Sequence, residues 1–412
     1  MTAQATISAW LRDSQADAQA FLAELVKVPT DTPPGDNAPH AERVAGLLQS
    51  MGFEVERHVV PDELVRSRGL RSLTNLVVRH RFGEGPVIAL NAHGDVVAPG
   101  AGWTHPPYGA EVHEGAMYGR GVAVSKSDFA TYTFALAAMR EAQARGAELH
   151  GTIELHFTYD EEMGGELGPA WLLAQGITKP DFAICAGFSY AIVTAHNGCL
   201  HLRVTVRGRS AHAAIPDTGA DALHAAVATL DRLYASRMQL ARIRSRVPGI
   251  GTPTLNVGTI HGGINTNVVP DEVVFQLDRR MVPEEDPAVV EAQLRALLQS
   301  PAAEWTPGIR VEIERLLLAR ALQPLPGQDR LVQALSRQAQ RVLGEAIPAH
   351  GVPLYTDARL YAEAGVPVVL YGAGPRTIED SNAKRADEHL RLDDLHRATE
   401  VVACALADLL AG

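Results

Sequence analysis

The spacing of apolar residues changes several times along the first half of the chain. Apolar residues recur at helical intervals over residues 9–28 and 40–52, and the second stretch ends at Gly52, a typical helix C-cap. Mostly apolar runs at 53–60, 75–80, 86–93 and 151–159 predict short strands, and a further helical pattern spans 128–146. Helices that alternate with buried strands predict an α/β domain with a mainly parallel sheet flanked by helices.

The pattern becomes strictly alternating near Gly198, which is typical of half-exposed strands. The following elements read β-α-β-β-α-β, the order of a small antiparallel sheet with helices on one face. After residues 323–328, "QPLPGQ", the α/β pattern resumes. We therefore expect a catalytic domain at 1–198 and 319–412, interrupted by an inserted α+β domain at 199–318.

Composition and charge narrow the range of partners and compartments. The 412 residues carry a net charge of −11, which argues against nucleic acid or an anionic membrane as a partner. The three cysteines form no CxxC pair and their odd number gives no disulfide framework, and no apolar run is long enough to span a membrane. The N-terminus lacks the pattern of a signal peptide, so we expect a cytoplasmic protein.

Six motifs are distributed over nearly the whole chain. They are "LNAHGDVV" (90–97), "YGRGVAVSKSD" (118–128), "FTYDEEMGG" (157–165), "GRSAHAAIPDTGADAL" (208–223), "GGINTNVVPDEVVFQLDRRMVP" (262–283) and "EDSNAKRADEHL" (379–390). Taken together, they resemble the M20 family of metallopeptidases and amidohydrolases. The resemblance implies that the inserted domain is a lid or dimerisation domain, and that the protein is a homodimer through it.

The resemblance also implies roles for four residues at the ends of two predicted strands. His93 matches a metal ligand, and Asp95 matches the carboxylate that orients that histidine. In "DEE", Glu161 matches the general base that deprotonates the attacking water, and Glu162 matches a metal ligand. Strand ends of this kind carry the sites of open α/β sheets, which favours a functional role.

Three other ligand positions of the family hold residues that do not bind metals. Lys126 fixes the register that puts Val124 where the bridging aspartate is expected; Gly187 replaces an acid and Lys384 a histidine. The family implies two Zn²⁺ or Co²⁺ ions, but one remaining ligand per ion binds zinc weakly, and a lysine ammonium repels a dication. From these substitutions we expect no metal cofactor.

The inserted domain supplies three further candidates through the resemblance. His212 matches a lid histidine that reaches the partner subunit's site and stabilises an oxyanion. Asn267 and Arg280 match positions that bind the carboxylate of a small substrate, and a forked guanidinium suits a carboxylate.

Three functions are compatible with these residues. The first is a metal-independent hydrolase that cuts an amide-type C–N bond in a small carboxylate-bearing substrate, with Glu161 activating water and Lys384 and His212 stabilising the oxyanion. The second is an isomerase, racemase or C–N lyase in which Glu161 and Lys384 transfer protons. The third is a non-catalytic binder of small molecules, for which a water-activating glutamate would be unnecessary.

Overall fold

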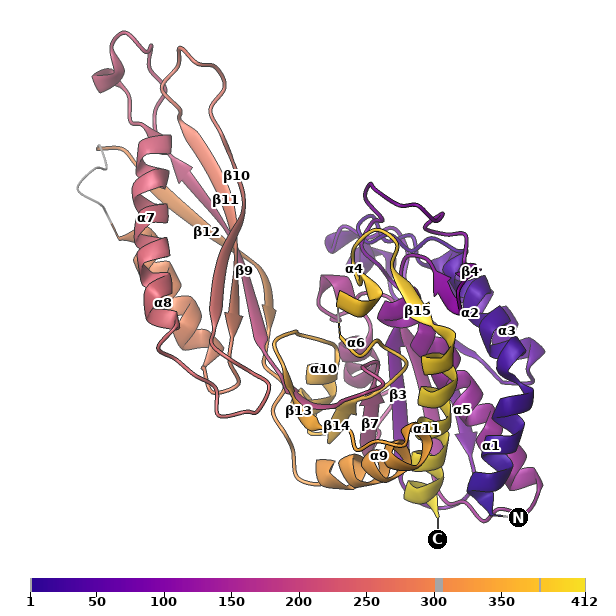
Figure 1. The fold of residues 1–412 in the computed structure, drawn as a ribbon. Coiled ribbons are helices and arrows are strands. Elements are labelled where there is room, and N and C mark those ends of the chain that lie inside the picture. Colours follow the sequence, from indigo (N-terminus) through magenta and orange to yellow (C-terminus); the bar gives the residue numbers. More distant parts are fainter. Residues whose placement is uncertain (1, 301–306, 378, 412) are drawn as a thin grey trace. The chain divides into compact units, whose positions relative to one another are not determined.

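The computed structural model describes residues 2–300, 307–377 and 379–411, which form two compact units (Figure 1). The first unit combines both ends of the chain, Met1–Thr194, Pro324–His350 and Thr356–Gly412. The second comprises Ala195–Gln323 and Gly351–Tyr355. The chain therefore leaves the first unit, builds the second and returns.

The first unit is built around an eight-stranded sheet in the order β1-β2-β6-β3-β7-β14-β8-β13. The central neighbours β6, β3, β7 and β14 run parallel, whereas β1, β2 and β8 pair antiparallel with their neighbours. The strands are Glu56–Val59 (β1), Thr74–Arg81 (β2), Val87–His93 (β3), Thr152–Thr158 (β6), Phe182–Cys185 (β7), Ile192–His196 (β8), Ala349–Val352 (β13) and Val368–Leu370 (β14). The predicted fold class, an α/β domain with a mainly parallel sheet, is confirmed.

Helices flank this sheet, and α11 packs against α1, α5 and α9 (Figure 1). A three-stranded sheet, β15-β5-β4, lies apart from the large one. The helices are Ala3–Asp13 (α1), Gln15–Val26 (α2), Ala38–Ser50 (α3), Asp62–Ser67 (α4), Ser127–Ala144 (α5), Pro169–Ala174 (α6), Gln328–Leu343 (α9), Ala358–Glu363 (α10) and Leu392–Leu410 (α11). The small strands are Glu111–His113 (β4), Ala116–Tyr118 (β5) and His389–Arg391 (β15).

The first predicted helix is divided in the structure. Residues 9–28 were expected to form one helix, but α1 ends at Asp13 and α2 begins at Gln15. The backbone N–H of Ser14 donates to the carbonyl oxygens of Trp10 and Leu11, which closes the last turn of α1. The apolar spacing continues through this break, so the sequence pattern alone does not reveal it.

The second unit is an antiparallel sheet in the order β10-β11-β9-β12, with two helices on one face (Figure 1). Its elements follow the chain as Gly198–Arg207 (β9), Ala222–Leu240 (α7), Thr254–Gly262 (β10), Glu272–Met281 (β11), Pro287–Gln299 (α8) and Arg310–Ala319 (β12). Alternate residues of β9, from Leu200 to Val206, are buried in a common core with α7 and α8. The predicted β-α-β-β-α-β order of the small domain is confirmed.

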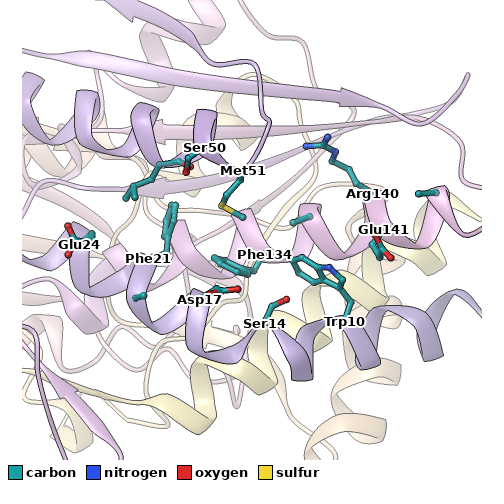
Figure 2. Close-up of a pocket in the computed structure, with 14 residues that line it drawn as sticks. Trp10, Ser14, Asp17, Phe21, Glu24, Ser50, Met51, Phe134, Arg140 and Glu141 are labelled. Carbon is teal, nitrogen blue, oxygen red and sulfur yellow. The ribbon is translucent and has the colours of Figure 1, made fainter.

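A groove on the first unit lies among α1, α2, α3 and α5 and encloses about 600 Å³ (Figure 2). Trp10, Phe21 and Phe134 line it, and the ring of Phe134 contacts the rings of both Trp10 and Phe21. None of its lining residues is a predicted site residue. Among the described residues, no helix is long and apolar enough to cross a membrane.

Candidate functional site

The candidate site forms where two parallel strands end side by side. His93, the last residue of β3, is paired in register with Thr158, the last residue of β6. Asp95 follows β3 by two residues, and Glu161 begins a short 3-10 turn after β6. Because the strands are parallel, both sets of side chains emerge at the same edge of the sheet, the usual place for sites in open α/β folds.

Asp95 fixes the segment that carries the two adjacent glutamates. Its carboxylate is fully buried and accepts hydrogen bonds from the backbone N–H groups of Glu161 (3.3 Å) and Glu162 (3.0 Å). Asp95 also contacts His93, whose Nδ1 lies 3.0 Å from the backbone oxygen of Asp95 and 3.4 Å from its Oδ1. Asp95 therefore holds His93 and both glutamates at once, a wider role than the orienting of one histidine.

The imidazole of His93 faces the predicted general base. Its Nε2 lies 3.9 Å from Oε2 of Glu161, and both side chains are almost completely buried. Burial lowers the pKa of His93, but the carboxylates of Glu161, Asp95 and Glu162 outweigh this effect and raise it to about 10. His93 therefore carries a proton at neutral pH and contributes positive charge to the site.

Burial raises the pKa of Glu161, while the charges on His93 and Lys384 lower it. The net direction is upward, toward the range in which a carboxylate is an effective base near neutral pH. Two cations beside the carboxylate keep part of its negative charge compensated in this buried position.

Lys384 supplies the second cation of the site. Its Nζ donates to Oε2 of Glu162 at 2.6 Å, and its side chain is 51% exposed, whereas that of Glu162 is 8% exposed. Burial lowers the pKa of Lys384, but Glu162 and Glu161 outweigh this effect and raise it. The ammonium is therefore charged and lies at the solvent side of the two glutamates.

Two buried carboxylic acids near the site were missed by the sequence analysis. Burial and the nearby charge of Asp95 raise the pKa of Asp160 to about 8. Burial, followed by Glu161 and Asp160, raises the pKa of Asp357 well above its ordinary value. Asp160 adjoins the "DEE" motif and could have been noticed, but nothing in the sequence around Asp357 indicates that it lies nearby.

The loop that carries Val124 is held in place by a buried ion pair. Glu388 pairs with Arg120 at 2.5 Å and also accepts from the backbone N–H groups of Ala123 (3.1 Å) and Val124 (3.3 Å). The side chain of Val124 packs against the hydrophobic core of the first unit. The position that the resemblance matches to a bridging carboxylate therefore holds the apolar side chain of Val124.

Gly187 has no room for a side chain. A Cβ at this position would lie 2.7 Å from the backbone nitrogen of Tyr371 and 2.8 Å from the carbonyl carbon of Leu370. Both obstacles are backbone atoms of the neighbouring chain segment, which cannot rotate away as a side chain could. An acidic residue therefore does not fit here unless β14 and its extension move.

The three remaining candidates lie in the second unit. His212 and Asn267 are exposed and close to each other, because the N–H of Ala213 donates to the carbonyl of Asn267. Arg280 lies at the other end of β11, where its Nε contacts both carboxylate oxygens of Asp278 at 2.9 and 3.1 Å. At the usual rise per residue, Glu272 and Arg280 are about 26 Å apart along the strand.

Comparison with known proteins places the chain in a family. Residues 89–408 match the model described as "Peptidase family M20/M25/M40". The chain belongs to this family. It is 29% identical over 409 residues to acetylornithine deacetylase of Myxococcus xanthus, covering 98% of this chain and 100% of that protein. It is 26% identical to succinyl-diaminopimelate desuccinylase of Gluconacetobacter diazotrophicus, covering 97% and 99%.

Solved M20 structures share the fold at lower sequence identity. A metallo-carboxypeptidase of Sulfolobus solfataricus superposes with a TM-score of 0.77 at 17% identity, covering 95% of this chain and 98% of that one. A dinuclear metal-binding M20 peptidase of Bacillus subtilis gives a TM-score of 0.64 at 16% identity, covering 97% and 99%. The predicted family is confirmed.

These comparisons correct the expectation about cofactors. Membership of the M20 family, which includes a dinuclear metal-binding peptidase, points to metal cofactors, so the prediction of none is wrong. That prediction rested on the three substituted positions, on a count of one remaining ligand per ion and on the charge of Lys384. The chain keeps imidazole and carboxylate groups at His93, Glu161 and Glu162, which are ordinary donors for a divalent cation.

The residues present do not reproduce the family's two-ion ligand set. Val124 is apolar, and Gly187 has no space for an acidic side chain. The ammonium of Lys384 donates a hydrogen bond to an oxygen of Glu162 that would otherwise be available to a metal ion. Over the part of the chain that the structure describes, three possible ligand atoms converge only in the second unit, and none of them belongs to this site. We therefore assign the proton transfers and the charge stabilisation of the reaction to this chain's own side chains.

Proposed function

We propose that this M20 protein hydrolyses an amide bond in a small, carboxylate-bearing substrate. Its relatives include a deacetylase and a desuccinylase, whose names describe removal of an acyl group from an amino acid derivative. The observation that carries the proposal is the buried Glu161 carboxylate, held by Asp95 and facing a protonated His93. This arrangement suits a general base that acts on water.

In the proposed reaction, Glu161 accepts a proton from water as the oxygen forms a bond with the amide carbonyl carbon. The carbonyl oxygen becomes an oxyanion, and the positive charges of Lys384 and His93 stabilise it because preformed charges need no reorganisation. The C–N bond then breaks, and Glu161 returns its proton to the leaving nitrogen. The products are an amine and a carboxylic acid.

We also propose that a second copy of the chain contributes to each site. His212 and Asn267 lie beyond the Glu272 end of β11, whereas Arg280 lies near its other end, and Glu272 and Arg280 are about 26 Å apart at the usual rise of a strand. This span exceeds a small substrate, so one chain cannot place all three on the same molecule. Sedimentation of the full chain tests the dimer, and mixing His212→Ala with Glu161→Gln chains should restore activity if His212 acts on the partner's site.

The reaction class can be tested with a panel of acetylated and succinylated amino acids in heavy-oxygen water. Hydrolysis predicts that one heavy oxygen appears in the released acid and that free amine forms in equal amount. Consumption of substrate without heavy oxygen in the product would instead support proton transfer or elimination by Glu161 and Lys384. Binding without turnover across the panel would support a non-catalytic role.

A further inference from the structure

The sheet of the second unit brings together a thiol, an imidazole and a carboxylate on one face. His201 of β9 is paired in register with Asp278 of β11, and Cys199 is paired with Arg280. Alternate residues of a strand share a face, so all four side chains lie on the same face. It is opposite to the one covered by α7 and α8, because the intervening residues Leu200 and Leu277 belong to the core.

Three ligand atoms of this cluster lie close together. The Sγ of Cys199 is 3.2 Å from Nε2 of His201, which is 3.1 Å from Oδ2 of Asp278. The same Sγ is 3.8 Å from Oδ1 of Asp278. Within the described residues, this is the one group of three His, Cys, Asp or Glu ligand atoms that converge.

The geometry does not suit a nucleophilic triad. In such a triad the imidazole contacts the nucleophile through one ring nitrogen and the carboxylate through the other. Here the single Nε2 of His201 faces both Cys199 and Asp278. Each of the three residues instead offers one ligand atom, and these atoms lie within 4.8 Å of one another, close enough to bind one ion.

We infer that Cys199, His201 and Asp278 form a zinc-binding site in the second unit. Tetrahedral zinc with bonds of about 2.0–2.3 Å holds its ligand atoms about 3.3–3.7 Å apart. Sγ of Cys199 and Oδ2 of Asp278 lie 3.2 and 3.1 Å from Nε2 of His201, so these two separations require changes of only a few tenths of an ångström. The 3.8 Å separation joins Sγ to the other carboxylate oxygen, Oδ1, and one ligand atom from each residue lies within 4.8 Å of the other two. A thiolate with an imidazole and a carboxylate favours Zn²⁺ over Mg²⁺ or Ca²⁺.

Arg280 completes the site as a positioning residue. Its Nε contacts both oxygens of Asp278, and its guanidinium lies 5.3 Å from the ring centre of Tyr355. Hydrogen bonds of this kind orient a ligating carboxylate. Since a thiolate and a carboxylate each carry one negative charge, the site still attracts a dication despite the guanidinium.

The cluster is accessible from one side. Cys199 is fully buried, whereas the side chains of His201 and Asp278 are 34% and 28% exposed. Three protein ligands leave a fourth tetrahedral position that a water molecule can fill. The cluster shares Arg280 with the predicted substrate-binding residues, but Glu161 and its neighbours belong to the first unit, so metal binding can be measured apart from hydrolysis.

Cobalt substitution tests the site through a spectroscopic signal. The full chain titrated with Co²⁺ should show a thiolate-to-cobalt charge-transfer band in the near ultraviolet. A metal bound by His93 or Glu162 gives no such band, because those residues offer no sulfur. Cys199→Ser should abolish the band and remove one equivalent of bound zinc in elemental analysis, while Cys404→Ser, a buried cysteine of α11, should leave both unchanged.

His201→Gln is a second variant, to be used if Cys199→Ser does not fold. The side chain of His201 is partly exposed, so its replacement should be tolerated. It should lower the affinity for Co²⁺ by more than about tenfold, because losing only a hydrogen-bond partner of a ligand already costs about 10–100-fold in metal sites. Absence of the band in the wild-type chain would overturn the inference. A band of equal intensity in His201→Gln, or its loss in Cys404→Ser, would do the same.

Discussion

The Nζ of Lys384 lies 2.6 Å from Oε2 of Glu162, so a cation contacts one of the two adjacent glutamates of the site. In the family's pattern the position of Lys384 belongs to a histidine that binds metal. Here the ammonium also acts on Glu161, because it lowers the pKa of that carboxyl against the effect of burial. The pair therefore links the charge of Lys384 to the protonation of the proposed base.

Lys384→Met should shift the pH dependence of hydrolysis. Without the ammonium the pKa of Glu161 rises further, and a protonated Glu161 cannot accept a proton from water. The acid limb of kcat/KM should therefore move to higher pH, and the plateau should fall by about a hundredfold. Lys384→Arg should keep the position of the limb, and Lys179→Met, at an exposed lysine, should change neither value. An unshifted limb in Lys384→Met would contradict this coupling.

His93 should make the stability of the fold depend on pH. Its pKa is about 10 in the folded state against an ordinary value of 6.5, so the folded protein binds the proton more tightly. This contribution is complete below pH 6.5 and is lost as the pH rises to about 10. The difference in Tm between wild type and His93→Asn should therefore narrow over that interval. His150→Asn, at an exposed histidine, is the control for replacing a histidine by asparagine. A Tm difference between wild type and His93→Asn that does not change with pH would refute the prediction.

Gly187→Ala should destabilise the first unit because its Cβ meets the backbone of Tyr371 and Leu370. Overpacking of this kind costs about 1–3 kcal/mol in the free energy of unfolding. The matched control is Gly46→Ala in α3, where a Cβ meets nothing within 4 Å. That change should stabilise the protein by about 0.5–1 kcal/mol, since alanine favours a helix over glycine. Urea denaturation of both variants measures the contrast, and equal effects would contradict the steric argument.

Glu388→Gln should loosen the loop that carries Val124. It leaves Arg120 buried without a charged partner, which typically costs about 3–5 kcal/mol. Glu345→Gln removes a charge from an exposed pair with Arg376 and should cost no more than about 1 kcal/mol. Chemical denaturation compares the two variants. A small loss in Glu388→Gln would show that the buried pair is not what anchors this loop.

The sequence predicted those parts of the fold that depend on apolar periodicity. The buried run at 86–93 became β3, and the alternation after Gly198 became β9, because strand patterns reflect which face is buried. The break at Ser14 was missed because helical spacing continues across it. The motif frame identified the positions of His93, Glu161 and Lys384, but their catalytic roles stay predictions.

Other features of the site depend on tertiary structure and could not be predicted from the sequence. The space at Gly187 depends on the backbone of residues far along the chain, and the proximity of Asp357 to Glu161 depends on tertiary packing. The cluster of Cys199, His201 and Asp278 depends on strand register, since Asp278 is distant in sequence from the other two. The cofactor prediction, drawn from the substituted positions and the one ligand left per ion, was wrong because membership of the M20 family points to metal cofactors.

The kinetics of Glu161→Gln test the central claim, that Glu161 is the general base of an amide hydrolase. The substitution keeps the size of the side chain and removes its ability to accept the proton of water, so kcat/KM should fall by about a thousandfold. Glu166→Gln, at an exposed glutamate five residues along the chain, should retain full activity. If Glu161→Gln hydrolyses the best substrate of the panel at the wild-type rate, the account of this site is wrong.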